Sequence, residues 1–79
     1  MDYQHILALA EDKFKNEFSY IIEDIKISIA SGSTGGEISA RVGKYLKDLE
    51  INNKPAYNII ARDIEFYLLS CRKHGLSII

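Results

Sequence analysis

Apolar residues recur at steps of three and four through the first 29 residues of the chain. This is the period of an amphipathic helix, in which such positions line one face. An unbroken helix of that length would measure about 40 Å. Because polar residues gather at 11–16, we expect the helix to break or kink there. Its apolar stripe consists of Tyr3, Leu7, Ala10, Phe14, Phe18, Ile21, Ile25 and Ile29.

A second helix is predicted after the glycine-rich segment at 31–36. Thr34 and Glu37 have the spacing of a capping box. In that motif the hydroxyl accepts from a backbone N–H in the first turn, and the carboxylate accepts from the N–H of the capping residue. The apolar residues that follow share one helical face, which consists of Ile38, Val42, Tyr45, Leu46 and Leu49.

A third helix is predicted after a second break at 51–55. Asn53 is a suitable N-cap, and Pro55 suits a first helical turn because no helical partner awaits its missing N–H there. Gly75 is suited to the left-handed conformation that ends many helices, and we expect 76–79 to fold back as an apolar plug. The core stripe of this helix is Tyr57, Ile60, Ile64, Leu68 and Cys71.

These patterns predict an all-α fold, a small bundle of three helices with short loops, or of four if the first segment breaks. A chain of 79 residues is long enough for one core, so we expect a single helical domain over 1–79. A hydrophobic content of 47% with only one proline argues against a disordered chain. A single cysteine cannot form an internal disulfide, so packing must hold the fold together.

Charge and hydropathy restrict the partners. Ten basic and eleven acidic side chains give a net charge of −1, so no basic excess favours nucleic acid. No apolar run approaches the roughly 18–20 residues that span a bilayer. The acidic pair Glu11 and Asp12 interrupts the apolar start, which argues against a signal peptide. We therefore expect a cytoplasmic protein that binds a protein rather than nucleic acid or a membrane.

The third helix has apolar residues on two sides. Projected at 100° per residue, Ile59 and Phe66 lie roughly opposite the core stripe, with Leu69 on their flank. Arg62 and Lys73 lie beside them, and uncovered apolar residues flanked by charge are typical of an interaction surface. We expect Ile59, Arg62, Phe66 and Lys73 to contact a partner. The alternative is that this helix is buried nearly all round, or that these are scattered surface residues.

The first helical segment repeats this pattern, because Leu9, Tyr20 and Ile27 lie away from its core stripe. Acidic residues are also frequent there, and an acidic surface speeds the capture of a basic protein. A merely solvated helix surface would explain these residues as well. The second predicted contact surface consists of Asp12, Tyr20, Glu23 and Ile27. A second copy of the chain, forming a homodimer, is the commonest way to cover such surfaces.

Candidate chemistry is sparse. Cys71 and His74 lie three residues apart on one helix, but two ligands do not make a metal site, and only His5 could join them by histidine. The same pair lacks an orienting third group for nucleophilic catalysis. The glycine-rich segment lacks the Lys-Ser/Thr pair of a P-loop, and Glu37 would repel an anion. We expect no catalytic residue, cofactor or metal, and therefore no enzyme.

The stretch Ser31-Gly32-Ser33-Thr34-Gly35-Gly36-Glu37-Ile38 resembles a small group of bacterial proteins. In that group a GSTGxEI-like segment opens the second helix of a short all-helical chain, and some members look like immunity proteins paired with secreted or contact-delivered toxins. The resemblance implies a cytoplasmic inhibitor that occludes the active site or substrate path of a toxin. It carries no catalytic residues over to this sequence.

The alternative function is a small dimeric DNA-binding regulator. The segment 34–43 looks like the first helix of a helix-turn-helix, but Lys44 stands where an apolar residue is expected. The pattern also continues to Leu49 without a turn, so the recognition helix would be the third. That helix offers only Lys54, Asn58 and Arg62 to phosphates and base edges.

Overall fold

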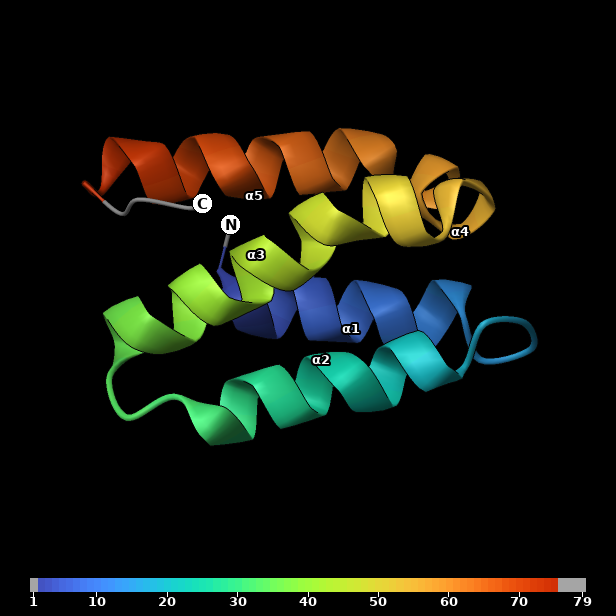
Figure 1. Cartoon of the computed structure of the whole chain (residues 1–79), viewed down its shortest axis with the longest axis horizontal. Helices are drawn as coiled ribbons and strands as arrows, with labels where there is room; N and C mark the ends of the chain where they lie inside the picture. The colour runs from blue at the N-terminus through green and yellow to red at the C-terminus, as the bar shows by residue number, and fades with distance from the viewer. Residues whose placement is uncertain (1, 76–79) are drawn as a thin grey trace.

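The computed structural model describes residues 2–75 and places five helices in that range (Figure 1). The expected all-α class is confirmed. The expected number of helices, three or four, is too low, because the first and third predicted segments are each divided. The plug expected at 76–79 lies outside the described residues. The helices are α1 (Tyr3–Lys13), α2 (Tyr20–Ser31), α3 (Gly35–Asn52), α4 (Lys54–Ile59) and α5 (Ala61–Lys73).

Two phenylalanines, Phe14 and Phe18, lie in the segment where the chain leaves α1 and turns into α2. Phe14 ends α1 with a non-helical backbone, and its side chain is fully buried. Phe18 has a φ of +64°, in the left-handed region that residues other than glycine seldom occupy. The two rings pack edge to face with their centroids 6.3 Å apart. The chain therefore turns at 14–19, slightly later than the polar cluster at 11–16 had indicated.

This break changes the phase of the core face. Ile6 and Ile22 are buried, although the continuous stripe omitted them, while Tyr3 and Leu7 are only partly buried. Leu9, which was expected to lie away from the core, packs against it. A helix that stops and restarts need not keep one stripe in register, so each half presents its own apolar face to the core.

The third predicted segment is divided at Ile60, whose φ of −125° and ψ of 25° are not helical. Its side chain remains buried. Its carbonyl oxygen accepts from the N–H of Ile64, and this hydrogen bond belongs to the first turn of α5. Neither glycine nor proline marks this break in the sequence. The N-cap predicted for this segment is confirmed, because Asn53 Oδ1 accepts from the N–H of Ala56 at 3.2 Å.

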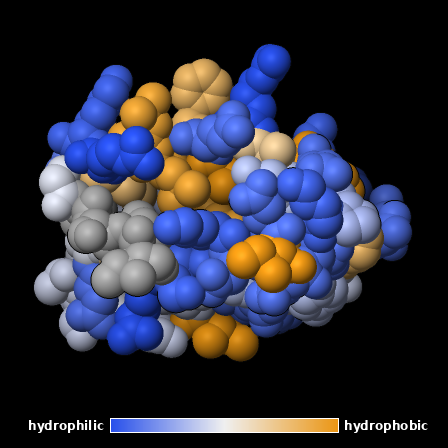
Figure 2. Space-filling model, turned by 45° about the horizontal axis from the view of Figure 1, so that its top comes forward, coloured by the Kyte–Doolittle hydropathy of each residue, from blue (hydrophilic) through white to orange (hydrophobic). Residues whose placement is uncertain are grey.

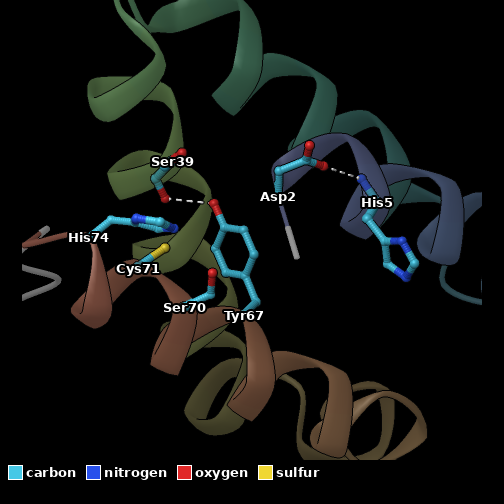
Figure 3. A pocket seen from close by; sticks show the side chains of 7 residues that line it. All are labelled: Asp2, His5, Ser39, Tyr67, Ser70, Cys71 and His74. Atoms are coloured by element: carbon cyan, nitrogen blue, oxygen red, sulfur yellow. Dashed lines mark hydrogen bonds between the residues drawn. The ribbon is translucent and has the colours of Figure 1, made fainter.

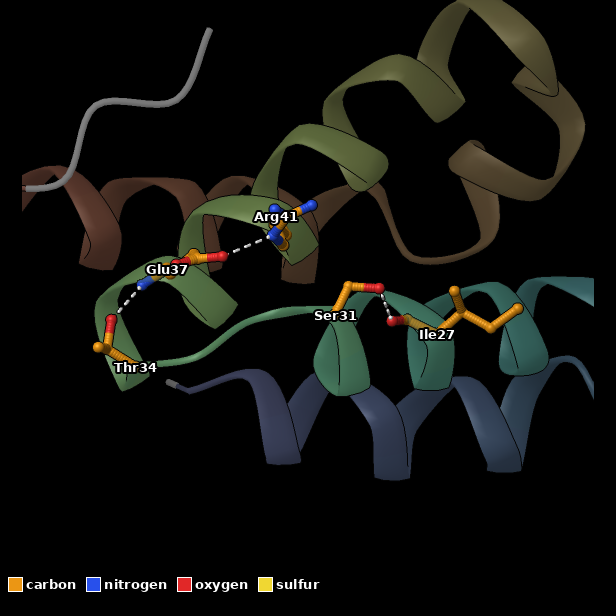
Figure 4. A network of polar contacts seen from close by, with 5 residues as sticks. All are labelled: Ile27, Ser31, Thr34, Glu37 and Arg41. Carbon is orange, nitrogen blue, oxygen red and sulfur yellow. Dashed lines mark hydrogen bonds and ion pairs between the residues drawn. The ribbon is translucent and has the colours of Figure 1, made fainter.

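The start of α3 is fixed by the predicted cap (Figure 4). Thr34 Oγ1 accepts from the N–H of Glu37 at 3.1 Å, as expected. The other half of the capping box is replaced, since the Glu37 carboxylate accepts from Arg41 Nε at 3.1 Å. Arg41 lies one turn along the same helix and offers a charged donor, which makes a stronger hydrogen bond than a backbone N–H.

Helices α5 and α2 occupy opposite sides of the molecule, with α1 and α3 between them (Figure 1). The core lies where these four helices meet. Among the described residues, no helix is both long and apolar enough to cross a membrane. The fully buried large side chains are Tyr67, Phe14, Ile6, Ile21, Ile25, Leu46, Ile60, Ile64 and Val42.

Candidate protein-binding faces

The outer side of α5 leaves large apolar side chains uncovered. Phe66 is 58% exposed and Leu69 is 44% exposed, and Ile59, at the end of α4, is 47% exposed. Arg62 and Lys73 are exposed on the same side of the helix. We refer to Arg62, Phe66, Leu69 and Lys73 as the α5 face, whereas Ile59 lies on α4, before the non-helical Ile60. Figure 2, which brings this side of the molecule forward, shows hydrophobic side chains at the surface between hydrophilic ones.

The α5 face follows from the period of the helix. Arg62, Phe66, Leu69 and Lys73 are spaced by four, three and four residues, so they form one line along the outside of α5. Two shallow depressions adjoin this line, and Phe66 and Leu69 contribute to both. One, of about 310 Å³, also involves Arg62 and Glu65. The other, of about 350 Å³, lies toward the C-terminal end of the helix and also involves Ser70, Lys73 and His74.

A second uncovered surface lies on α2. Tyr20 is 51% exposed and Ile27 is 63% exposed, and Glu23 lies between them on the same side. We refer to these three residues as the α2 face. The Tyr20 hydroxyl accepts a hydrogen bond from Asn53 Nδ2 at 2.6 Å, which joins the start of α2 to the α3–α4 junction. Glu23 forms an exposed ion pair with Lys26 at 3.5 Å.

The eight residues predicted to contact a partner do not form one surface. Helices α5 and α2 lie on opposite sides of the molecule (Figure 1), and each bears its face on the side away from its own buried residues, so the two faces point apart. Asp12 is exposed near the end of α1, where it pairs with Lys13 at 3.8 Å. The predicted exposure of the apolar members of both faces is confirmed, and their contact with a partner remains a prediction.

Sequence reasoning missed one exposed apolar residue and one groove. Ile51 is 85% exposed, because α3 continues past Leu49 and its last turn carries Ile51 away from the core. The second apolar stripe ends at Leu49, so the sequence predicted an end for this helix that is too early. The groove, of about 510 Å³, lies between α2 and α3 beside Ile27. The hydroxyl of Tyr45 donates to Asp24 Oδ2 at 2.7 Å and so ties these two helices together.

A polar pocket of about 360 Å³ lies near the starts of α1 and α3 and the end of α5 (Figure 3). Two of its polar side chains are hydrogen-bonded to the backbone. The Tyr67 hydroxyl donates to the carbonyl oxygen of Ser39 at 2.9 Å, and Asp2 Oδ1 accepts from the N–H of His5 at 3.0 Å as the N-cap of α1. The lining residues are Asp2, His5, Ser39, Tyr67, Ser70, Cys71 and His74.

The chemistry of this pocket is that of a packed helix junction. Burial raises the pKa of the Cys71 thiol, an effect that its contact with Tyr67 only partly offsets, and a thiol is a much weaker nucleophile and metal ligand than a thiolate. Burial likewise raises the pKa of Tyr67. In Figure 3 the imidazole of His5 lies on the far side of Tyr67 from Cys71. Within residues 2–75, no three histidine, cysteine, aspartate or glutamate side chains are grouped closely enough to hold a metal ion.

The geometry also bears on the DNA-binding alternative. Helix α3 continues through Gly43 to Asn52 without a turn, so the helix that follows it is α4. This helix has six residues, of which Ala56 and Tyr57 are buried in the core. Little of α4 is therefore free to enter a major groove, and Arg62 belongs to the next helix.

Comparison with known proteins yields no relative: no protein-family description matches the chain, and neither a curated protein nor a solved structure matches it significantly.

Proposed function

We propose that this chain is a non-catalytic protein-binding module that acts as a cytoplasmic inhibitor, neutralising a toxin-like protein by occlusion. The α5 face is the docking surface. The observation that carries the proposal is the line of Arg62, Phe66, Leu69 and Lys73, in which two large apolar side chains stand uncovered between two cations. Aromatic and arginine side chains are the types that most often dominate binding energy.

Two physical features support a docking role. Burying a Phe or Leu side chain contributes about 1.5–3 kcal/mol relative to full exposure, and roughly half of each side chain here is still available for burial. The helix that carries them is held from behind by the buried Ile64, Tyr67 and Cys71. A partner would therefore meet a preformed surface and would lose little free energy in ordering it.

The toxin-directed role rests on the resemblance of 31–38 to immunity-type proteins. In this chain Thr34 of that segment caps α3 and Glu37 pairs with Arg41 on the next turn of the same helix, so both residues stabilise the scaffold. Inhibition by occlusion requires a stable surface and no reacting group. In the polar pocket, the Tyr67 hydroxyl is hydrogen-bonded to the Ser39 carbonyl oxygen and Asp2 caps α1, so these two groups also stabilise the scaffold.

The test uses capture followed by neutralisation. Wild-type protein and the Phe66→Ala variant serve as baits in a lysate of the cells that produce the chain, and any protein enriched by the wild type is then expressed alone. We expect that protein to arrest growth, and we expect co-expression of the wild-type chain to restore growth. Phe66→Ala should weaken the complex about fivefold to thirtyfold, as truncation of a binding anchor does.

Ile51→Ala is the matched control, because it removes an even more exposed apolar side chain outside the α5 face. It should bind and neutralise like the wild type, and far-ultraviolet circular dichroism should report the same helix content for all three proteins. A captured protein that is harmless when expressed alone would overturn the inhibitor proposal. Equal neutralisation by wild type and Phe66→Ala would overturn the assignment of the α5 face.

A further inference from the structure

The charges on the α5 face restrict what can cover it. Along the outer line of α5 the order is Arg62, Phe66, Leu69 and Lys73, so a cation stands at each end of an apolar centre. Glu65 lies to one side of this line, next to Arg62 in the same depression. An occupant of this face therefore needs an apolar centre and an acidic group about one helical turn away from it.

A second α5 face does not meet this requirement. If two copies of α5 pair antiparallel about the centre between Phe66 and Leu69, Arg62 of each copy lies opposite Lys73 of the other. If they pair parallel, each cation lies opposite itself. Both symmetric arrangements place like charges across the contact, which disfavours pairing.

The α2 face meets the requirement. Glu23 and Ile27 are four residues apart on the outside of α2, the same spacing that separates Arg62 from Phe66 and Leu69 from Lys73. When α2 lies parallel to α5 of another copy, Glu23 faces Arg62 as Ile27 faces Phe66. When it lies antiparallel, Glu23 faces Lys73 as Ile27 faces Leu69. The exposed pair between Glu23 and Lys26 is too weak to prevent either arrangement.

We infer that the chain associates with itself head to tail, the α5 face of one copy docking on the α2 face of the next. Helices α5 and α2 lie on opposite sides of the molecule and their faces point apart, so each docked pair still presents one free face of each kind (Figure 1). Such a contact does not close on itself, and it produces short linear oligomers that lengthen with concentration.

Because the contact involves one side of two helices of 12 and 13 residues, we expect it to belong to the small, transient class of interfaces that bury less than roughly 1,200 Å². This inference goes beyond the proposed inhibitor role and does not depend on it, although both use the α5 face. A foreign partner on the α5 face would compete with self-association and shorten the oligomers.

Sedimentation velocity of the pure protein from about 10 µM to about 1 mM tests the inference, because weak contacts populate only in that range. The wild-type protein should show a weight-average mass that rises continuously past that of a dimer. Phe66→Ser and Ile27→Ser each block one face, and each alone should lower the association constant about tenfold or more. Raising the ionic strength should also weaken wild-type association, because the facing charges are exposed.

The decisive measurement mixes the two blocked variants. Phe66→Ser retains an intact α2 face and Ile27→Ser retains an intact α5 face, so the mixture should form a one-to-one dimer that does not grow further. Ile51→Ser, which alters neither face, should assemble like the wild type. Circular dichroism should show unchanged helix content in every variant, because all three side chains are exposed.

Three results would overturn the inference: a wild-type monomer at the highest concentration, a dimer of Ile27→Ser alone, or a dimer of Phe66→Ser alone. The second would identify an α5–α5 contact and the third an α2–α2 contact. The neutralisation experiment uses dilute protein and a foreign partner, so failure of self-association leaves the proposed function standing, and the reverse also holds.

Discussion

Phe66 and Tyr67 are consecutive aromatic residues on α5, yet they occupy opposite surroundings. Phe66 is 58% exposed on the α5 face, whereas Tyr67 is 1% exposed and donates its hydroxyl proton to the carbonyl oxygen of Ser39 on α3. One residue turns the side chain by about 100° around a helix, which is enough to move it from the core boundary to the solvent. Residue type therefore says little about role here, and position on the helix decides it.

The largest expected effect comes from truncating the inner member of this pair. Tyr67→Ala removes a fully buried ring and its hydrogen bond, so we expect the free energy of unfolding to fall by about 3–5 kcal/mol. Phe66→Ala is the matched substitution on the outer side and should change it by no more than about 0.5 kcal/mol. Urea denaturation followed by circular dichroism measures both. Equal losses for the two variants would contradict the assignment of Tyr67 to the core and of Phe66 to the solvent.

A smaller loss in the free energy of unfolding is expected when a substitution in the loop before α3 displaces the residues of α3 that contact the inner side of α5. A Cβ atom on Gly32 would lie 2.5 Å from Cγ1 of Ile38 and 2.9 Å from its backbone nitrogen, and Ile38 immediately precedes Ser39, the partner of Tyr67. Gly32→Ala should therefore destabilise the protein by about 1–3 kcal/mol.

Gly35→Ala is the control for this substitution, because a Cβ atom at Gly35 meets nothing within 4 Å. It should leave stability unchanged or raise it by about 0.4–1 kcal/mol, since alanine restricts the unfolded chain more than glycine does. The same urea titration applies. If Gly32→Ala matches Gly35→Ala, the loop has room to relax, and the approach of Gly32 to Ile38 does not position α3.

A third substitution, with a smaller expected loss than Tyr67→Ala and Gly32→Ala, isolates the hydroxyl of Tyr67. Tyr67→Phe keeps the ring and removes the bond to Ser39, so we expect a loss of about 0.5–1.5 kcal/mol at neutral pH. Burial raises the pKa of Tyr67 in the folded protein above the ordinary tyrosine value of about 10. The unfolded chain therefore loses the phenolic proton first as the pH rises.

The stabilising contribution of this group is thus complete below pH 10 and is lost progressively above it. The free energy of unfolding should decline more steeply above pH 10 in the wild type than in Tyr67→Phe. Tyr45, whose pKa is also raised by burial and by Asp24, is present in both proteins, so the difference between their curves reports Tyr67. Parallel curves would mean that Tyr67 does not titrate differently in the folded protein.

Much of the local structure could be predicted because its causes are local. Thr34 and Asn53 cap α3 and α4 as their spacing to the following turns indicated, and Gly75 adopts a φ of +78° at the end of α5. The exposure of Phe66 and Ile27 was predictable for the same reason, since the helical period fixes which side chains share a face. Ile51 was missed because its helix extends further than its apolar stripe.

The breaks at Phe18 and Ile60 were not predictable with the same certainty, because no proline or glycine marks either position. Phe18 takes a left-handed backbone next to the buried Phe14, and Ile60 leaves the helical region while its side chain stays buried. These departures are stabilised by packing against other helices, and such packing outweighs local propensity. The shifted core face of α1 and α2 follows from the first of them.

The sequence by itself determined the helical class, the caps and the amphipathic faces, because each depends on residues within one or two turns of each other. Only the tertiary structure decided which apolar residues meet. The bond from Tyr67 to Ser39 spans 28 positions, and the bond from Tyr45 to Asp24 spans 21. The tertiary structure also placed the α5 face and the α2 face on opposite sides of the molecule, since burying the inner faces of both helices against α1 and α3 leaves the outer faces pointing apart.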